Sequence, residues 1–210
     1  MTEQTQTPDE TATHAAETLA EDPALSSVVE RYGPLTLTPA DDLFERVVVS
    51  LIRQQISMDA AAAIRERLFE TVTVTPAGVL AAERETLQEA GLSAAKAEYI
   101  CNVATAFQAN GYDRTHFEAM SDEAVMAELT DIRGVGPWTG KMFLLFGLGR
   151  PDVFPVEDLG VRRGMELVFE ADIGADGTAE MTRTEMRNRA EEWRPYRSYA
   201  SLYLWRVYEG

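Results

Sequence analysis

The sequence predicts an all-α protein. Apolar residues recur at the three- and four-residue spacing of an amphipathic helix, and Ser, Thr, Gly and Pro stand where helices begin and end. Strand signals are limited to short β-branched or apolar stretches at 35–38 and 71–75. A chain of 210 residues with 45% hydrophobic residues can bury a sizeable core, as one domain or as two packed lobes.

The elements can be placed in order along the chain. Residues 1–22 are rich in Thr, Glu and Ala with few large apolar side chains, which indicates a disordered, mobile acidic tail. The helices expected after it are 43–52, 57–72 opened by Ser57, a segment opened by Thr75-Pro76, and 93–110 between Ser93 and Gly111. They continue with 122–129 capped by Ser121, a segment from the Thr182-x-x-Glu185 capping box to about Trp193, and a last helix over about 197–208.

The formal net charge of −16 is unusual for a protein that binds nucleic acid, but it is unevenly distributed. Residues 1–49 carry a net −8, whereas 131–165 carry +1 and 187–206 carry +3. Random scatter among short windows is the alternative interpretation. Abundant Asp and Glu with only two lysines also suggests a salt-adapted, halophile-like source.

Cysteine count and hydropathy exclude several classes of protein. A single cysteine, Cys101, excludes a disulfide framework and a four-cysteine iron–sulfur cluster or zinc site within the chain. No window approaches about eighteen uninterrupted apolar residues, and the N-terminus has no signal-peptide pattern. We therefore expect a cytoplasmic protein without a membrane partner.

The chemistry is concentrated around Gly134-Val135-Gly136-Pro137. One helix ends here, two glycines allow a tight turn, and Pro137 opens the next helix. The glycines let backbone approach a ligand, and the second helix offers N–H groups and the positive end of its dipole. The pattern predicts an anion cradle suited to a DNA phosphate. For Gly-x-Gly alone, an ordinary helix–helix turn is the alternative.

A longer string connects this turn with a known family. Residues 129–140, Leu-x-x-Ile-x-Gly-Val-Gly-Pro-Trp-Thr-Gly, resemble the helix-hairpin-helix of the DNA glycosylases, and Val153-Phe-Pro-x-x-Asp158 resembles the loop and aspartate that follow it. Three further segments agree: Ile52–Ser57, Gly91–Lys96 and Trp193–Ala200. Over about residues 40–208 the chain resembles the 3-methyladenine DNA glycosylase II family, in the short form without an N-terminal β domain.

The resemblance implies one helix-hairpin-helix glycosylase domain over 23–210. Two helical lobes would enclose a DNA-binding, active-site cleft. The inner lobe would comprise about 55–150, and the second lobe 23–54 together with 151–210.

The implied function is base-excision repair of double-stranded DNA with alkylated bases. The damaged nucleotide would be flipped out of the stack, and the N-glycosidic bond of an alkylated purine of the 3-methyladenine type would be hydrolysed. Gln54 and Gln55 would fill the gap in the base stack; an exposed polar helix end is their alternative interpretation. The DNA-binding residues of the hairpin would be Arg133, Gly134, Val135, Gly136 and Thr139.

Asp158 is the candidate catalytic residue. Breaking an N-glycosidic bond builds positive charge on the sugar, which a nearby carboxylate stabilises while it orients the attacking water. An alkylated purine is already positively charged and leaves as a neutral base, so one carboxylate suffices. Asp158 also precedes the expected helix 159–165, and capping that helix is its alternative role. Glu157 is the adjacent competitor, but the family match falls on Asp158.

Two tryptophans are candidates for the base pocket. Trp138 stands where glycosylases that also nick the strand carry a Schiff-base lysine, and a tryptophan cannot form an imine, so we predict simple hydrolysis. Lys141 lies three residues further on and is not excluded by geometry alone. The faces of Trp138 and, by resemblance, Trp193 would hold an electron-poor base. Core packing is the alternative for each.

The resemblance further implies a monovalent cation held by the backbone carbonyls of Thr130, Ile132 and Val135, with no required cofactor and no iron–sulfur cluster. A DNA-cleft enzyme of this size is expected to be a monomer, associated with the nucleoid when bound to DNA. A non-catalytic helix-hairpin-helix DNA-binding module is the alternative of a different class. Asp158 and the tryptophans favour the enzyme, since a scaffold needs neither.

Overall fold

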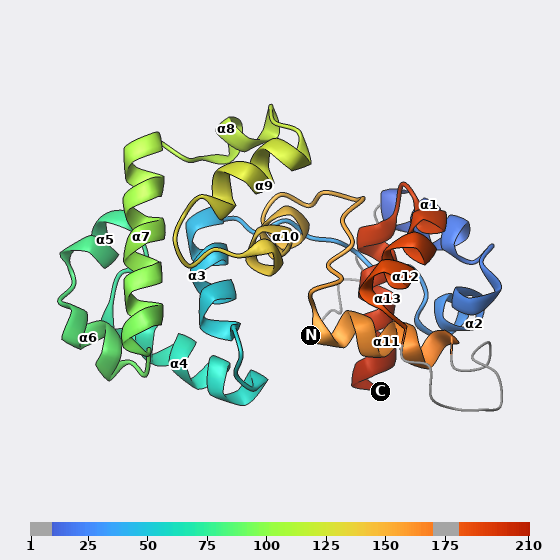
Figure 1. Cartoon of the computed structure of the whole chain (residues 1–210), viewed down its shortest axis with the longest axis horizontal. Helices are drawn as coiled ribbons and strands as arrows, with labels where there is room; N and C mark the ends of the chain where they lie inside the picture. The colour runs from blue at the N-terminus through green and yellow to red at the C-terminus, as the bar shows by residue number, and fades with distance from the viewer. Residues whose placement is uncertain (1–9, 170–180) are drawn as a thin grey trace, which may run out of the picture. The chain divides into compact units, whose positions relative to one another are not determined.

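The computed structural model describes residues 10–169 and 181–210, which contain helices and no strand, so the predicted all-α class is confirmed (Figure 1). These residues fall into two compact units. Unit 1 combines the N-terminal residues up to Thr38 with Arg150–Gly210, and unit 2 is Pro39–Gly149. Within the described ranges, no helix has the length and hydropathy that crossing a membrane requires.

Unit 2 is built around one amphipathic helix. Its helices are α3 (Leu43–Arg53), α4 (Met58–Thr71), α5 (Pro76–Ala81), α6 (Arg84–Glu89), α7 (Ala94–Asn110), α8 (Arg114–Glu118), α9 (Asp122–Thr130) and α10 (Pro137–Phe146). α3 buries its apolar face and packs against α7 and α10, as Figure 1 shows. The predicted N-caps accept backbone N–H bonds as expected; they are Ser57, Thr75, Ser93 and Ser121. These local signals therefore fix where α4, α5, α7 and α9 begin.

Unit 1 joins segments from both ends of the chain. Its helices are α1 (Glu10–Leu19), α2 (Pro23–Tyr32), α11 (Leu159–Phe169), α12 (Arg183–Ala190), the short 3₁₀ turn η1 (Glu191–Trp193) and α13 (Arg197–Glu209). α13 packs against α11, α1 and α2. The capping box of Thr182 and Glu185 is present as predicted.

The predicted disordered tail is wrong for the residues that the structure describes. Residues 10–19 form α1, which buries Ala12, Ala15, Ala16 and Leu19 and packs against α2 and α13. Alanine has the strongest intrinsic helix preference, and its small side chain lets helices approach closely. The prediction of disorder rested on the lack of large apolar side chains, and an alanine face has none. Residues 1–9 lie outside the described part of the chain.

The predicted lobe boundary near residue 54 is also wrong. The division falls between Thr38 and Pro39 and between Gly149 and Arg150, so α3 belongs to unit 2. The physical reason is burial: Val47, Val48 and Leu51 of α3 are at most 1% exposed, and the helix contacts α7 and α10. The second boundary agrees with the predicted one at about residue 150.

Two glycines of α11 bring its backbone close to α13. A Cβ on Gly164 would lie 2.0 Å from the carbonyl oxygen of Leu204, and one on Gly160 would lie 2.8 Å from Cδ1 of Trp205. The two glycines are four residues apart, so they share one face of α11. This face lets α13 approach the N-terminus of α11, where Asp158 stands.

Candidate functional site

The hairpin of unit 2 joins α9 to α10. Gly134 has φ of +106°, and a Cβ there would lie 2.2 Å from Cγ of Tyr99. Val135 is buried, and its amide donates to the carbonyl of Ile132 at 2.9 Å. Gly136 is the N-cap of α10, where no side chain caps the helix and no atom lies within 4 Å of an added Cβ. The turn is therefore packed against Tyr99 at Gly134 and open at Gly136, next to the positive end of α10.

This difference predicts opposite behaviour for two alanine variants. Gly134→Ala forces a side chain into a left-handed φ and into Tyr99, so we expect a loss of more than about 1 kcal/mol in the free energy of unfolding. Gly136→Ala has space for its methyl group and is expected to unfold at the wild-type temperature, yet to bind duplex DNA more weakly, because the methyl group blocks backbone approach. Thermal unfolding and duplex titration check both. Wild-type DNA affinity in Gly136→Ala would contradict the predicted anion cradle.

Gln54 connects the end of α3 with this hairpin. Its Nε2 donates to the carbonyl of Gly134 at 3.2 Å and to Oγ1 of Thr139 at 2.9 Å. Thr139 is only 1% exposed. Both side chains were predicted to contact DNA, and the structure instead engages them with each other inside unit 2. They fix the hairpin relative to the turn that follows α3.

The next residue, Gln55, is presented by a strained turn. It is exposed and has φ of +59°, which makes it the one non-glycine residue with positive φ among those described. Lys96 stabilises this turn, because its Nζ donates to the carbonyls of Ile52 at 2.6 Å and Gln54 at 2.8 Å. Burial lowers the pKa of Lys96. The lysine thus caps the C-terminal carbonyls of α3, where a cation also opposes the helix dipole.

Arg133 lies in the hairpin turn with an exposed guanidinium group. Its Nη1 pairs with Oε1 of Glu98 at 2.7 Å, and 74% of its side chain is accessible. Asn102 donates from Nδ2 to the carbonyl of Arg133 at 3.2 Å. The guanidinium group of Arg133 is therefore accessible at the hairpin, although Glu98 partly offsets its charge.

The two candidate pocket tryptophans differ in burial. Trp138, in the first turn of α10, is half-buried. Trp193 is 1% exposed, stacks on Phe169 with ring centroids 6.3 Å apart, and donates from Nε1 to Oδ2 of Asp22 at 2.6 Å. The predicted pocket role of Trp193 is therefore wrong: the residue packs in the core of unit 1, and its indole N–H already has a partner.

Asp158 stands directly before α11 in unit 1, and the structure gives its carboxylate a defined orientation. Oδ1 accepts the amide of Val161 at 3.0 Å and the indole N–H of Trp205 at 2.8 Å. The aspartate is half-buried, so its carboxylate combines an N-cap bond with partial access to solvent. The neighbouring Glu157 faces a different partner, Arg187, whose Nη2 lies 3.6 Å from Oε1. The capping role is thus confirmed for Asp158, and it does not conflict with a catalytic one.

Trp205 is a site residue that sequence reasoning missed. It lies in the last predicted helix, is half-buried, and bonds to Asp158 across 47 residues of sequence. No local signal identified it, because its bond to Asp158 depends on the packing of α13 against the glycine face of α11. A half-exposed tryptophan with its N–H on a carboxylate acts as a positioning group for that carboxylate.

The indole bond predicts separate effects for two tryptophan variants. Trp205→Phe removes a hydrogen bond to a charged group, so we expect the base release that the resemblance implies to fall about tenfold or more in single-turnover experiments. The melting temperature should change little, because water can reach the half-buried carboxylate of Asp158. Trp193→Phe removes the bond to Asp22 in the core, so we expect the free energy of unfolding to fall by about 1–3 kcal/mol while the folded protein keeps its turnover rate. Single-turnover kinetics and thermal unfolding separate the two. A loss of stability in Trp205→Phe together with a loss of base release in Trp193→Phe would contradict both roles.

The described ranges contain no group of three or more His, Cys, Asp or Glu side chains placed to hold a metal. The carbonyls predicted to hold a monovalent cation are those of Thr130, Ile132 and Val135, in and beside the hairpin turn. Of these, the carbonyl of Ile132 accepts the amide of Val135. A carbonyl oxygen has two lone pairs, so this bond leaves the donor set compatible with a cation.

The all-α fold, the glycine hairpin at a helix N-terminus and the oriented aspartate agree with the class that the sequence resemblance implied, the base-excision DNA repair proteins. The family model described as "HhH-GPD superfamily base excision DNA repair protein" matches residues 48–193. The chain therefore belongs to this superfamily, and within it to the 3-methyladenine DNA glycosylase family.

Individual relatives agree with this assignment. The chain is 30% identical over 191 residues to the "Alkylbase DNA glycosidase-like protein mag2" of Schizosaccharomyces pombe, covering 87% of this chain and 86% of the relative. It is 31% identical to the longer YfjP of Bacillus subtilis, covering 89% of this chain and 66% of that protein. The S. pombe 3-methyladenine DNA glycosylase Mag1, solved in complex with abasic DNA, superposes with a TM-score of 0.82 at 27% identity and covers 92% of this chain and 96% of its own.

Proposed function

We propose that this chain is a monofunctional DNA glycosylase that hydrolyses the N-glycosidic bond of alkylated purines in double-stranded DNA, with Asp158 as its catalytic carboxylate. The observation that carries the proposal is the fixed orientation of Asp158, whose Oδ1 accepts from both Val161 and Trp205. The names of the relatives support the substrate class, since they are alkylbase or 3-methyladenine glycosylases.

The chemistry needs one carboxylate. As the bond between sugar and base breaks, positive charge develops on the sugar, and a negative group held close to it lowers the barrier. The alkylated base leaves neutral, so no general acid is required. Asp158 would also orient the water that attacks the anomeric carbon.

The tryptophan at the position where an imine-forming lysine would stand supports simple hydrolysis. Trp138 occupies the first turn of α10, and it would stack against the flipped base. Lys141, one turn further along α10, is the remaining amine in this helix. Borohydride trapping should therefore yield no DNA adduct, and an adduct lost in Lys141→Gln would instead establish lyase chemistry.

DNA would be held through the hairpin, and Gln55 would occupy the gap that the flipped nucleotide leaves. Gln55 is the better candidate of the glutamine pair, because Gln54 is bonded to Gly134 and Thr139. A monovalent cation on the carbonyls of Thr130, Ile132 and Val135 would stiffen the hairpin. We expect the enzyme to act as a monomer in the cytoplasm.

Base release from a panel of duplexes tests the proposal. Duplexes with 3-methyladenine, 7-methylguanine, ethenoadenine or hypoxanthine are incubated with wild type and Asp158→Asn, and the free base is measured. Release of at least one alkylated purine by wild type alone is the expected result. DNA binding without release of any base would establish the alternative, a non-catalytic DNA-binding module.

A further inference from the structure

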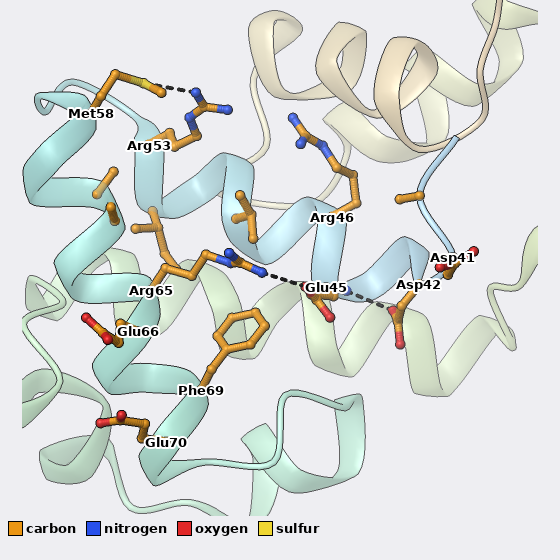
Figure 2. A pocket seen from close by; sticks show the side chains of 15 residues that line it. Asp41, Asp42, Glu45, Arg46, Arg53, Met58, Arg65, Glu66, Phe69 and Glu70 are labelled. Carbon is orange, nitrogen blue, oxygen red and sulfur yellow. Dashed lines mark hydrogen bonds and ion pairs between the residues drawn. The ribbon is translucent and has the colours of Figure 1, made fainter. Parts of the chain in front are cut away.

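A groove of about 990 Å³ lies between α3 and α4 in unit 2 (Figure 2). Two arginines of α3, Arg46 and Arg53, line it. They are two helical turns apart, so they share one face of the helix. Figure 2 shows both guanidinium groups extending to the same side of α3.

Arg46 has no carboxylate partner among the described residues. Its guanidinium carbon lies 4.8 Å from the ring centroid of Phe146, and its Nε is buried without a hydrogen-bond acceptor. Burial and the charge of Arg53 lower the pKa of Arg46 to about 10, so it stays charged at neutral pH. In the free protein the ring of Phe146 is therefore the partner of Arg46, and no carboxylate of the described residues offsets its charge. The chain has 35 acidic side chains, yet none of those described pairs with it.

Arg53 is held only weakly. Its Nη2 lies 2.9 Å from Sδ of Met58, and a thioether sulfur is a weak acceptor that a stronger one readily replaces. The third arginine of the groove differs, since Arg65 pairs with Glu45 at 3.3 Å. The groove's other carboxylates lie before α3 and along α4; they are Asp41, Asp42, Glu66 and Glu70. Arg46 lies in the first turn of α3 and Arg53 is its last residue, so the positive charge that no carboxylate of the described residues offsets runs along the face of α3 that both share.

We propose that Arg46 and Arg53 together bind a phosphate group of the DNA backbone next to the flipped nucleotide, a site that rests on the proposed function. The guanidinium groups of Arg46 and Arg53 match the oxygens of a phosphate, whose charge would neutralise two cations that no carboxylate of the described residues pairs with. The source of the phosphate follows from position. Arg53 is two residues before Gln55, a span of at most about 7 Å, so it must lie beside any strand into which Gln55 inserts.

The test measures binding of undamaged duplex DNA over a range of salt concentrations. Arg46→Gln and Arg53→Gln are compared with Arg65→Gln, a matched control in the same groove. We expect each of the first two to weaken binding about tenfold and to reduce the slope of log K against log salt, and the double variant to reduce it by about 0.9, as the loss of one phosphate contact requires. Arg65→Gln should keep the wild-type affinity and slope. Equal behaviour of all three variants would overturn the proposal.

Thermal unfolding of the free protein supplies a second readout. If Arg46 serves the ligand, Arg46→Gln should melt at or above the wild-type temperature while DNA affinity falls. A lower melting temperature would assign Arg46 a structural role and overturn the site.

A second experiment measures the melting temperature in millimolar inorganic phosphate, with chloride at matched ionic strength as the control. A phosphate-dependent rise in melting temperature, abolished in Arg46→Gln without any change in the DNA slope, would mean a free anion and overturn the DNA source. Because undamaged DNA is used, absence of base release in wild type would refute the proposed function and leave this test intact.

Discussion

Asp158→Asn should lower single-turnover release of an alkylated purine by at least about 100-fold, because it removes the negative charge that stabilises the sugar cation. The substitution is otherwise conservative. An asparagine oxygen can still accept the amide of Val161 and the indole of Trp205, and Asn is as good an N-cap as Asp. We therefore expect the melting temperature to change little and DNA affinity to be kept.

Two controls separate charge from structure in this experiment. Asp158→Ala removes the cap as well as the charge, so it should lose about 1 kcal/mol of stability in addition to its activity. Glu157→Gln changes the adjacent carboxylate, which faces Arg187, and should retain base release. Wild-type turnover in Asp158→Asn, or an equal loss in Glu157→Gln, would refute the catalytic role of Asp158.

Gly164→Ala should destabilise unit 1 by about 3 kcal/mol, at the upper end of the range for overpacking a core. The new methyl group would lie 2.0 Å from the carbonyl oxygen and 2.6 Å from the carbonyl carbon of Leu204. Both are backbone atoms, so no rotamer change relieves the overlap, and α11 and α13 must separate. Urea denaturation measures the loss.

Gly160→Ala is the informative comparison on the same helix face. Its methyl group would meet the side chains of Trp205 at 2.8 Å and Asp158 at 3.2 Å, which can move. We expect a smaller loss of stability than in Gly164→Ala, but a clear loss of turnover, because the moving groups belong to the site. Equal stability of Gly164→Ala and wild type would contradict the close backbone approach.

Local signals in the sequence predicted most helix boundaries, since an N-cap and the amide it accepts are only two or three residues apart. Ser93 and Gly111 bracket α7 as expected, and Ser121 opens α9. The hairpin was also predictable, because its glycines and Pro137 are consecutive. α1 was not, because a run of alanines shows no large apolar stripe.

The site was predictable only in part, because side-chain partners depend on contacts between distant segments. Asp158 could be located from its motif, but its bond to Trp205 spans 47 residues and the bond from Gln54 to Thr139 spans 85. Nothing local distinguishes Trp193, which packs in a core, from Trp205, which orients a carboxylate. Residue type identified the candidates, and tertiary packing assigned their roles.

Lys96, which bonds to the turn that presents Gln55, limits which substitutions its own position can accept. Lys96 is one of only two lysines among the nineteen basic side chains. Lys96 satisfies two convergent carbonyls with one compact ammonium, whereas a flat guanidinium is wider and holds its donors in a fixed plane. We therefore expect Lys96→Arg to displace Gln55 even though it keeps the positive charge.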